Sequence, residues 1–397
     1  MKQGWEYCQL EDAVKKGSSN ISLNKIKGED GKYPVFAAKG FVQNVSFYHQ
    51  EEKYLAIIKD GAGIGRVSKH PAKSSVVGTM QYLIPKKGFD IDFIKYFLEG
   101  IDFEKHRNGS TIPHIYFKDY KSEKFPKIPL PEQYRIVSIL DECFAAIERS
   151  RNNAEQNLKN AKELFESYLQ GVFEKKGDDW EKKKLGEVSK INYGYTEKAS
   201  FEEVGPKFLR ITDIQENGVD WVTVPYCKCS EKDFPKYKLE TGDIVFARTG
   251  ATTGKSYLIN NPPNAVFASY LIRLRMNSIS EFIPEFISYF FQTKTYWDKI
   301  NAGISGSAQG GFNATKLGEL EFHFPKSKEE QQIIVRQLDA LRAETQKLEA
   351  VYQKKIADLE ELKKSILQKA FAGELRGGAV PKPVEGAIPK TEKTVAV

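Results

Sequence analysis

The distribution of apolar residues divides the chain into two kinds of segment. In the first kind, apolar residues form short runs, such as 54–58 and 243–247, and each run ends at a glycine-rich turn. These runs have the length of buried strands, and the Gly, Pro and Asn around them are typical of mixed globular regions. In the second kind, apolar residues recur every seven positions between charged faces, which predicts long helices that pair as a coiled coil.

The two predicted helices occupy residues 131–175 and 327–375, and each is roughly 60 Å long at 1.5 Å per residue. Pro131 suits the first turn of a helix, where no amide hydrogen bond is lost. Ser327 followed by Glu330 has the spacing of a capping box, which marks a helix start. In the first helix the heptad positions are Leu140, Ile147, Ala154, Ala161 and Tyr168, and the companion row is Phe144, Leu158, Phe165 and Val172. In the second helix the heptad positions are Leu338, Tyr352, Leu359 and Ile366, flanked by Leu341, Leu348, Ile356 and Leu362.

Both halves of the chain carry these patterns in the same order. The helical sequence that starts at Ser167 recurs from Ser365, a shift of 198 residues, and the strand and turn around Gly61 recur around Gly250, a shift of 189. A duplicated chain can fold with an approximate two-fold axis, and two-fold symmetry is a common way to bind two half-sites on duplex DNA.

Composition narrows the classes of protein. A chain of 397 residues is long enough for two or more domains, and 40% hydrophobic with 12% aromatic residues argues against disorder. The sequence has no apolar run long enough for a membrane span and no apolar signal core at its start, so we expect a cytoplasmic protein. The net charge of +7 is compatible with nucleic-acid binding without demanding it. Reduced thiols are expected, because the one close pair, Cys227 and Cys229, lacks a zinc spacing.

Three motifs suggest enzymes, and each lacks an essential part. The sequence Asn261-Pro262-Pro263-Asn264 has no aromatic residue to stack on a flipped base, as an adenine methyltransferase loop requires. The glycines from Gly61 and from Gly250 lead into strand-like sequence, whereas a nucleotide loop should open a helix. The five histidines form no ligand pair at helical spacing. We therefore predict no catalytic residue, no bound metal and no cofactor in this chain.

A basic residue flanks both glycine turns on each side. Lys59 and Arg66 bracket the first turn, and Arg248 and Lys255 bracket the second. Such pairs can straddle a phosphate backbone or read base edges, although a solvated hairpin explains the same charges. The repeated loops at 108–111 and 305–309 are further candidates, with an ordinary loop as the alternative. The predicted DNA-binding residues are Lys59, Arg66, Lys69, Arg107, Ser110, Arg210, Arg248, Thr249, Thr252, Lys255, Ser307 and Gln309.

The chain resembles the DNA-specificity subunit of Type I restriction–modification systems over residues 1 to about 375. The similarity is carried by residues 239–255 (Leu-Glu-Thr-Gly-Asp-Ile-Val-Phe-Ala-Arg-Thr-Gly-Ala-Thr-Thr-Gly-Lys), with support from 208–214, 31–36, 131–133 and 370–375. Each motif is modest alone, and their order, present twice, is specific.

The resemblance implies an α+β fold in which two mixed α/β target-recognition domains, in pseudo-two-fold arrangement, are separated by two long antiparallel coiled-coil helices. The predicted segments are a recognition domain at 1–130, a spacer helix at 131–175, a second recognition domain at 176–326, a spacer helix at 327–375 and a disordered tail at 376–397.

The resemblance also implies a function. The chain would read a bipartite target on double-stranded DNA for two copies of a methyltransferase subunit and for a restriction (motor-nuclease) subunit. The target would be asymmetric, because the opening of the second domain at 191–196 has no clear counterpart in the first. A specificity subunit of a Type IIB enzyme, a coiled-coil scaffold without base readout and an autonomous methyltransferase are the alternatives.

Overall fold

The structure is a computed structural model that describes residues 5–175, 177, 179–215, 218–277, 281–305 and 313–375. The chain forms two compact units. Unit 1 combines residues 1–155 with 353–397, and unit 2 comprises residues 156–352. The predicted tail at 376–397 and the predicted contact residues Ser307 and Gln309 lie outside the described residues.

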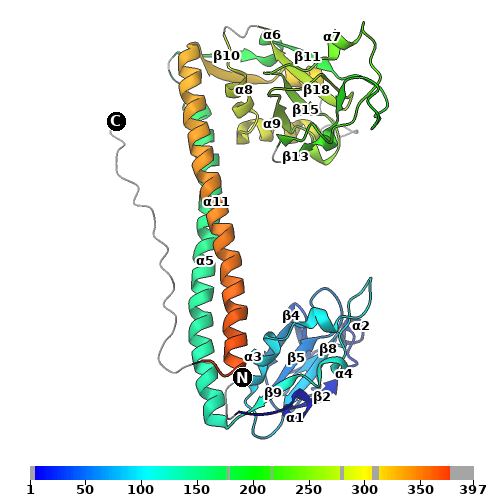
Figure 1. Cartoon of the computed structure of the whole chain (residues 1–397), viewed down its shortest axis with the longest axis vertical. Helices are drawn as coiled ribbons and strands as arrows, with labels where there is room; N and C mark the ends of the chain where they lie inside the picture. Colours follow the sequence, from blue (N-terminus) through cyan, green and yellow to red (C-terminus); the bar gives the residue numbers. More distant parts are fainter. Residues whose placement is uncertain are drawn as a thin grey trace, which may run out of the picture. The chain divides into compact units, whose positions relative to one another are not determined.

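Unit 1 is built around a four-stranded antiparallel sheet with the order β2-β8-β5-β6. A second sheet, β4-β3-β7, contains the parallel pair β3–β7, and β1 pairs with β9. The elements are β1 (Glu6–Gln9), α1 (Leu10–Ala13), β2 (Val14–Ser18), α2 (Leu23–Ile26), β3 (Tyr33–Ala37), β4 (Gly40–Val45), β5 (Tyr54–Ile58), β6 (Val67–His70), β7 (Ser75–Val76), β8 (Met80–Pro85), α3 (Ile91–Glu99), the 3₁₀ helix Phe103–His106, α4 (Phe117–Tyr120), β9 (Lys124–Lys127) and the start of α5 (Leu130–Glu174) (Figure 1).

Unit 2 repeats this architecture. Its four-stranded antiparallel sheet has the order β11-β18-β15-β16, β12 and β17 form the parallel pair, and β10 pairs with β19. The elements are β10 (Trp180–Lys184), α6 (Leu185–Val188), β11 (Ser189–Tyr193), β12 (Lys207–Leu209), the 3₁₀ helix Ile211–Asp213, β13 (Ile214–Gln215), β14 (Gly218–Val219), α7 (Phe234–Tyr237), β15 (Ile244–Ala247), the 3₁₀ helix Gly250–Thr252, β16 (Ser256–Leu258), β17 (Ala265–Phe267), β18 (Leu271–Met276), α8 (Pro284–Phe290), α9 (Lys294–Ser305), α10 (Ala314–Gly318), β19 (Glu321–Pro325) and the start of α11 (Lys328–Phe371).

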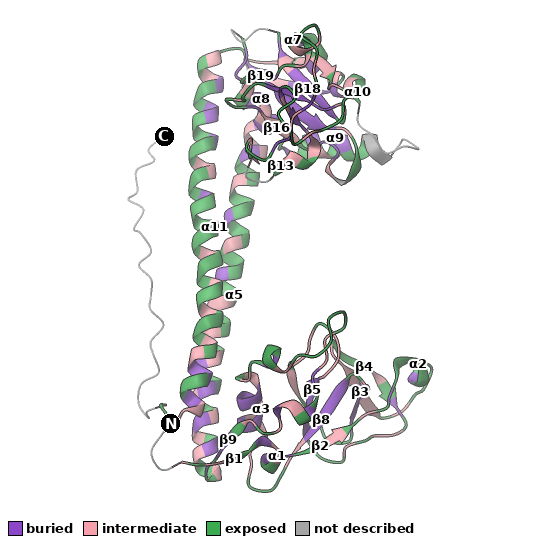
Figure 2. Cartoon of the chain, turned by 45° about the vertical axis from the view of Figure 1, so that its right-hand side comes forward, coloured by how far each residue is buried: buried purple, intermediate pink, exposed green. Residues whose placement is uncertain are grey.

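The two apolar runs form inner strands of the four-stranded sheets, as predicted. All five residues of β5 and all four of β15 are buried, because each strand lies between two neighbours and is covered on both faces. A short helix then joins each sheet to the long helices. In unit 1, Phe93 and Phe97 of α3 share a core with Leu140 of α5 and Leu367 of α11. Burial of each such side chain contributes roughly 2 kcal/mol. In unit 2, α8 occupies the same position between sheet and helices (Figure 2).

The long helices α5 and α11 are present and pair with each other inside each unit. In unit 1, Arg151 binds Glu360 at 2.8 Å, and in unit 2 the Tyr168 hydroxyl donates to Gln337 at 3.2 Å. In unit 1, Lys363 of α11 also lies over the ring of Phe144 of α5. Residue numbers along α11 therefore fall as those along α5 rise, so the two helices are antiparallel.

Two predicted seam positions were wrong, because Leu348 and Leu362 expose 41% and 42% of their surface. An α-helix with 3.6 residues per turn drifts relative to a strict seven-residue repeat, so the contact passes to a neighbouring residue. Tyr168 contacts Gln337 across the helix pair, although it exposes 41% of its surface and the adjacent Leu169 is buried. The capping box predicted at Ser327 is half formed. The Ser327 hydroxyl accepts from the Glu330 amide at 3.2 Å, while the Glu330 carboxylate accepts from the Trp180 indole.

A buried glutamine fixes the first turn of each long helix to the globular part of its unit. Gln133 is fully buried, donates to the carbonyl oxygens of Gly88 and Ile128 at 3.0 and 2.8 Å, and accepts from the Asp90 amide at 2.8 Å. Gln331 makes the same three bonds, each at 3.0 Å, to the corresponding backbone groups of unit 2. The predicted α+β fold with duplicated mixed domains and two long antiparallel helices is confirmed.

Candidate nucleic-acid interface

The two glycine turns have the same backbone conformation. Gly61 and Gly65 have φ angles of +96° and +82°, and Gly250 and Gly254 have angles of +78° and +86°. The amide of Gly65 donates to the carbonyl of the last residue of β5 at 2.9 Å, and that of Gly254 donates to the last residue of β15 at 2.8 Å. A left-handed conformation favours glycine, so these residues set the shape of the turn in both units.

Each turn leads into a strand, β6 or β16, as predicted. Beneath Gly65 lies Phe103, and beneath Gly254 lies Ile300, so close that an added Cβ would approach a side-chain carbon to 2.6 or 2.7 Å. The turns are therefore pressed onto the cores of their units. This rigid backing holds the flanking basic residues in a defined position.

In unit 2, the two flanking cations keep their charge available. The Arg248 guanidinium donates to the Ser269 carbonyl at 3.2 Å and lies 4.9 Å from the centre of the Tyr193 ring. Lys255 is exposed and makes no ion pair or hydrogen bond through its side chain within the part of the chain that the structure describes. Thr249 is exposed and Thr252 is half-buried in the same turn.

In unit 1, one of the two cations is neutralised locally. The Lys59 ammonium pairs with Asp60, whose other carboxylate oxygen lies 2.7 Å from Nδ1 of His114. Burial alone would raise the pKa of Asp60, but the hydrogen bonds from Lys59 and His114 outweigh it and hold that pKa below its ordinary value. Unit 2 has the neutral Thr249 at the position of Asp60. Arg66 is exposed, and its guanidinium lies over Gly63.

The structure brings the turn of unit 1 together with the loop at 108–114, which the sequence suggested as a separate candidate. The Gly61 amide donates to the carbonyl of Pro113 at 2.9 Å, and the backbone groups of Asn108 and His114 bond to each other at 2.8 Å in both directions. Ser110 is exposed at the tip of this loop.

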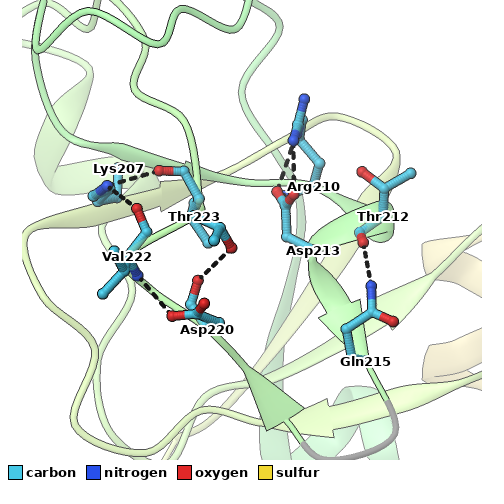
Figure 3. Close-up of polar contacts among 9 residues, drawn as sticks. Lys207, Arg210, Thr212, Asp213, Gln215, Asp220, Val222 and Thr223 are labelled. Atoms are coloured by element: carbon cyan, nitrogen blue, oxygen red, sulfur yellow. Dashed lines mark hydrogen bonds and ion pairs between the residues drawn. The ribbon is translucent and has the colours of Figure 1, made fainter.

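The remaining predicted cations belong to ion pairs. Lys69 binds Asp92 at 2.7 Å, Arg107 binds Glu104 at 3.2 Å, and Arg210 binds Asp213 at 2.7 Å. The Arg210 pair uses two nitrogens of the guanidinium and lies beside Thr212 and Gln215 (Figure 3). The exposed pairs of Lys69 and Arg107 contribute roughly 0–1 kcal/mol each, so a DNA phosphate can compete for these cations. Arg210 is held more firmly, because its partner Asp213 exposes only 9% of its side chain. All three cations are weaker candidates than Arg248 and Lys255.

Sequence reasoning did not select the aromatic residues beside Arg248. Tyr193 and Tyr270 expose 42% and 64% of their surface, and the amide of Arg248 donates to the carbonyl of Tyr270 at 3.2 Å. Exposed rings next to cations are typical of nucleic-acid surfaces, where they stack on bases or contact thymine methyl groups. The available signal was the tyrosine-rich opening of the second domain at 191–196.

Two further features of the described residues concern what the chain binds. No helix in the described ranges is long and apolar enough to cross a membrane. No group of three or more His, Cys, Asp or Glu side chains among those same residues could hold a metal ion.

The fold is that of a duplicated protein with two mixed helix and strand regions and two long pairing helices. The family model described as the Type I restriction modification DNA specificity domain matches residues 2–156 and 177–358. The chain belongs to this family.

Similar proteins include the Type I restriction enzyme EcoKI specificity subunit of Escherichia coli (strain K12), which is 26% identical over 384 residues. That alignment covers 89% of this chain and 82% of the relative. The MjaVIII specificity subunit of Methanocaldococcus jannaschii is 24% identical, with 94% and 93% coverage.

Solved structures share the fold. A chain from a structure titled "Structural basis underlying complex assembly and conformational transition of the type I R-M system" aligns with a TM-score of 0.74 at 16% identity, covering 94% of this chain and 99% of its own length. The HsdS subunit from Thermoanaerobacter tengcongensis aligns with a TM-score of 0.58 at 17% identity, covering 94% and 98%.

Proposed function

We propose that this chain is a non-catalytic specificity subunit that reads a bipartite, asymmetric target on double-stranded DNA and directs separate methyltransferase and restriction subunits to it. Membership of the DNA-specificity family supports a role in sequence recognition. We place its action in the cytoplasm, in keeping with four free cysteines. The predicted domain limits at residues 130, 175 and 326 are part of this proposal.

The observation that carries the proposal is the glycine turn, which occurs twice with one backbone conformation and basic flanks. In unit 2 the turn presents Arg248 and Lys255 beside exposed tyrosine rings. A guanidinium there can form paired hydrogen bonds to guanine, and an ammonium can bind phosphate. In unit 1, the Lys59–Asp60 pair leaves Arg66 as the main cation of the turn. The difference supports two half-sites of different sequence.

The outer faces of the long helices offer docking positions for the methyltransferase subunit. Leu164 and Leu362 are equivalent under the shift of 198 residues and expose 51% and 42% of their surface. Single exposed leucines are common on protein surfaces, but a leucine exposed at the same position of both halves can contact the same surface on each of two partner subunits. Their presence in both halves favours two copies of one partner. A Type IIB enzyme would use the same features, and its partner would distinguish it.

Substitution of the unit 2 cations tests the proposed function in the complex with the methyltransferase subunit. We expect Arg248→Ala with Lys255→Ala to weaken binding to the target at least ten-fold, and to reduce the slope of log affinity against log salt by about 1 to 2. Arg248→Lys should keep the salt slope and lose sequence preference, because lysine lacks the forked donor geometry.

Lys354→Ala with Lys355→Ala is the matched control, because it removes two positive charges from exposed positions of α11. Binding that keeps its full sequence preference in the Arg248 and Lys255 variants would contradict the assignment. Assembly of an intact complex with no sequence preference at all, even with the unaltered chain, would favour a scaffold. Methyl transfer by the isolated chain would show an enzyme.

A further inference from the structure

Unit 2 has a cavity directly beside its glycine turn. The cavity has a volume of about 890 Å³, which lies in the range of sites that bind small ligands. Thr252 and Lys255 of the turn form part of its wall, together with residues of the 3₁₀ helix Ile211–Asp213, of strands β13 and β16 and of the segment 291–297. We call this cavity the turn pocket.

Two aromatic rings in the wall of the turn pocket are only partly buried. Tyr257 packs against the core around β12, β15 and β17, whereas Trp297 packs against the core that α8 and α9 share with the sheet. Trp297 lies under the turn, since a Cβ added at Gly254 would be 3.4 Å from its ring, and the Tyr257 hydroxyl lies beside Gly218 of β14. Two rings from different cores thus leave apolar surface facing the pocket, which favours a flat ligand that can stack.

Neutral polar groups with unused hydrogen-bonding capacity also line the turn pocket. The Gln215 side chain donates to the Thr212 carbonyl at 2.8 Å, which leaves its own oxygen as a free acceptor (Figure 3). The hydroxyls of Thr252 and Ser256 make no hydrogen bond to any residue that the structure describes. Free donors and acceptors beside aromatic walls suit a nucleobase, whose edge carries amino, carbonyl and ring nitrogen groups.

The charge of the turn pocket matches a single phosphate. Lys255 is the one charged side chain among the described residues of its wall, and this lysine forms no ion pair with them. A nucleoside triphosphate would place several negative charges against this one cation. It would also require the N-terminus of a helix, whereas the turn continues into β16. A nucleotide with one phosphate is therefore the better fit.

The corresponding place in unit 1 has a different lining. The groove beside the first turn has a volume of about 730 Å³, and the one aromatic residue that the structure places in its wall, Phe103, is buried. Its charged residues are the acidic Glu99, Asp102, Glu104 and Glu360 and the basic Arg66, Lys363 and Lys364. Carboxylates repel a phosphate, and no half-exposed ring is available for stacking, so we expect a nucleotide site in unit 2 and none in unit 1.

We propose that the turn pocket binds a nucleotide, with its base against Tyr257 and Trp297, its edge at Gln215 and its phosphate at Lys255. The nucleotide can come from DNA, as one that is extruded from the duplex, or from free mononucleotides in solution. The DNA source rests on the proposed function. Position favours that source, because Lys255 belongs both to the turn that is proposed to contact the duplex and to the pocket wall. A base that leaves the stack at this turn would have the pocket beside it.

A mismatch scan of the target tests the DNA source in the complex with the methyltransferase subunit. Mismatched pairs open more easily, so a mismatch at an extruded pair should strengthen binding. The pairs that contain the methylated adenines stay matched, because methyltransferases extrude their own target base. We expect several-fold tighter binding for a mismatch at one position of the half-site that depends on Arg248, and at no position of the other half-site. Gln215→Trp fills the pocket from an exposed position and should abolish this gain, while Thr223→Trp, exposed and outside the pocket wall, should keep it.

Calorimetric titration of the full chain alone with dAMP, dGMP, dCMP and dTMP tests the free source. Binding that Gln215→Trp weakens at least ten-fold and Thr223→Trp leaves within two-fold would support a site for free nucleotides. A mismatch gain that disappears in Gln215→Trp would support extrusion, with or without such binding. If neither effect is found, or if Gln215→Trp leaves both unchanged, the pocket proposal is wrong. A complex without sequence preference would contradict the proposed function, and the titration would still decide whether the pocket binds a nucleotide.

Discussion

His70 illustrates at the residue scale how the stability of unit 1 depends on pH. It exposes 7% of its surface and stacks on Tyr54 at 5.3 Å between ring centres, with Phe36 at 4.7 Å and the Ser68 hydroxyl 2.7 Å from Nε2. Burial lowers the pKa of His70 to about 4. The domain therefore folds with a neutral imidazole in its core.

The low pKa of His70 predicts a loss of stability in weak acid. Between its unfolded pKa, roughly 6.5, and the folded value of about 4, the unfolded state binds more protons, so stability falls as the pH falls. We expect this group to remove about 2 kcal/mol of the stability of unit 1 between pH 7 and pH 5. His70→Phe should keep the aromatic stack and lose most of this dependence.

Pulse proteolysis in a urea series at the two pH values measures this effect for fragments of unit 1. The urea midpoint of the unaltered chain should fall between pH 7 and pH 5 by more than that of the His70→Phe variant. Equal falls in the two proteins would show that another group controls the acid response.

At the scale of elements, the helix pair keeps one contact in both units with its partners exchanged. In unit 1, Lys363 of α11 lies 5.1 Å from the ring centre of Phe144 on α5. In unit 2, Arg342 of α11 lies 4.8 Å from the ring of Phe165 on α5 and 4.6 Å from Tyr289. Under the shift of 198 residues, Arg342 corresponds to Phe144, and Phe165 corresponds to Lys363. The contact is conserved within the molecule while its cation and ring have changed places.

This exchange predicts that the unit 1 contact can be inverted. Phe144→Arg alone places a second cation opposite Lys363, and Lys363→Phe alone removes the cation, so each should destabilise unit 1. The double variant should recover most of the loss, because the new guanidinium can cover Tyr96 as Arg342 covers Tyr289. The coupling energy should be about 1 kcal/mol in a double-mutant cycle of urea midpoints. Additive losses would mean that the contact contributes nothing specific.

The elements that sequence reasoning found are those with a strong local signal. The buried strands β5 and β15, the helices α5 and α11 and the glycine turns follow from apolar periodicity and from positive φ angles that favour glycine. The seam was misassigned at Leu348 and Leu362, because a straight α-helix drifts relative to a strict seven-residue repeat and the sequence does not show how far supercoiling of the pair compensates for it.

The roles of individual site residues depended on partners distant in sequence. The Glu132-Gln133 and Glu330-Gln331 repeats were visible in the sequence, but the backbone groups that each glutamine binds lie up to 50 residues away. The same holds for Asp60, whose partner His114 is 54 residues away, and for Tyr193 beneath Arg248. The sequence alone identified the basic residues, but it could not distinguish those held in ion pairs from those whose charge is free to contact DNA.

At the scale of the whole molecule, the continuity of α5 and α11 through both units predicts a link between helix length and target length. The boundary between the units falls after Glu155 in α5 and after Tyr352 in α11. Inside each unit the two helices run antiparallel, since residue numbers fall along α11 as they rise along α5. A heptad inserted at both places therefore preserves the antiparallel register and the phase of the seam.

If the paired helices set the unread gap of the proposed bipartite target, this double insertion should lengthen it. Seven residues add about 10.5 Å, which corresponds to at most about three base pairs at 3.4 Å each. Three base pairs also rotate one half-site by about 100° around the DNA axis, so binding should weaken and the gain can be smaller than three. Sequencing of methylated adenines in DNA exposed to the assembled complex gives the gap directly. The same heptad placed after Leu375 leaves both helices unchanged and should leave the gap unchanged. An identical gap in the targets of both variants would show that the helices do not set it.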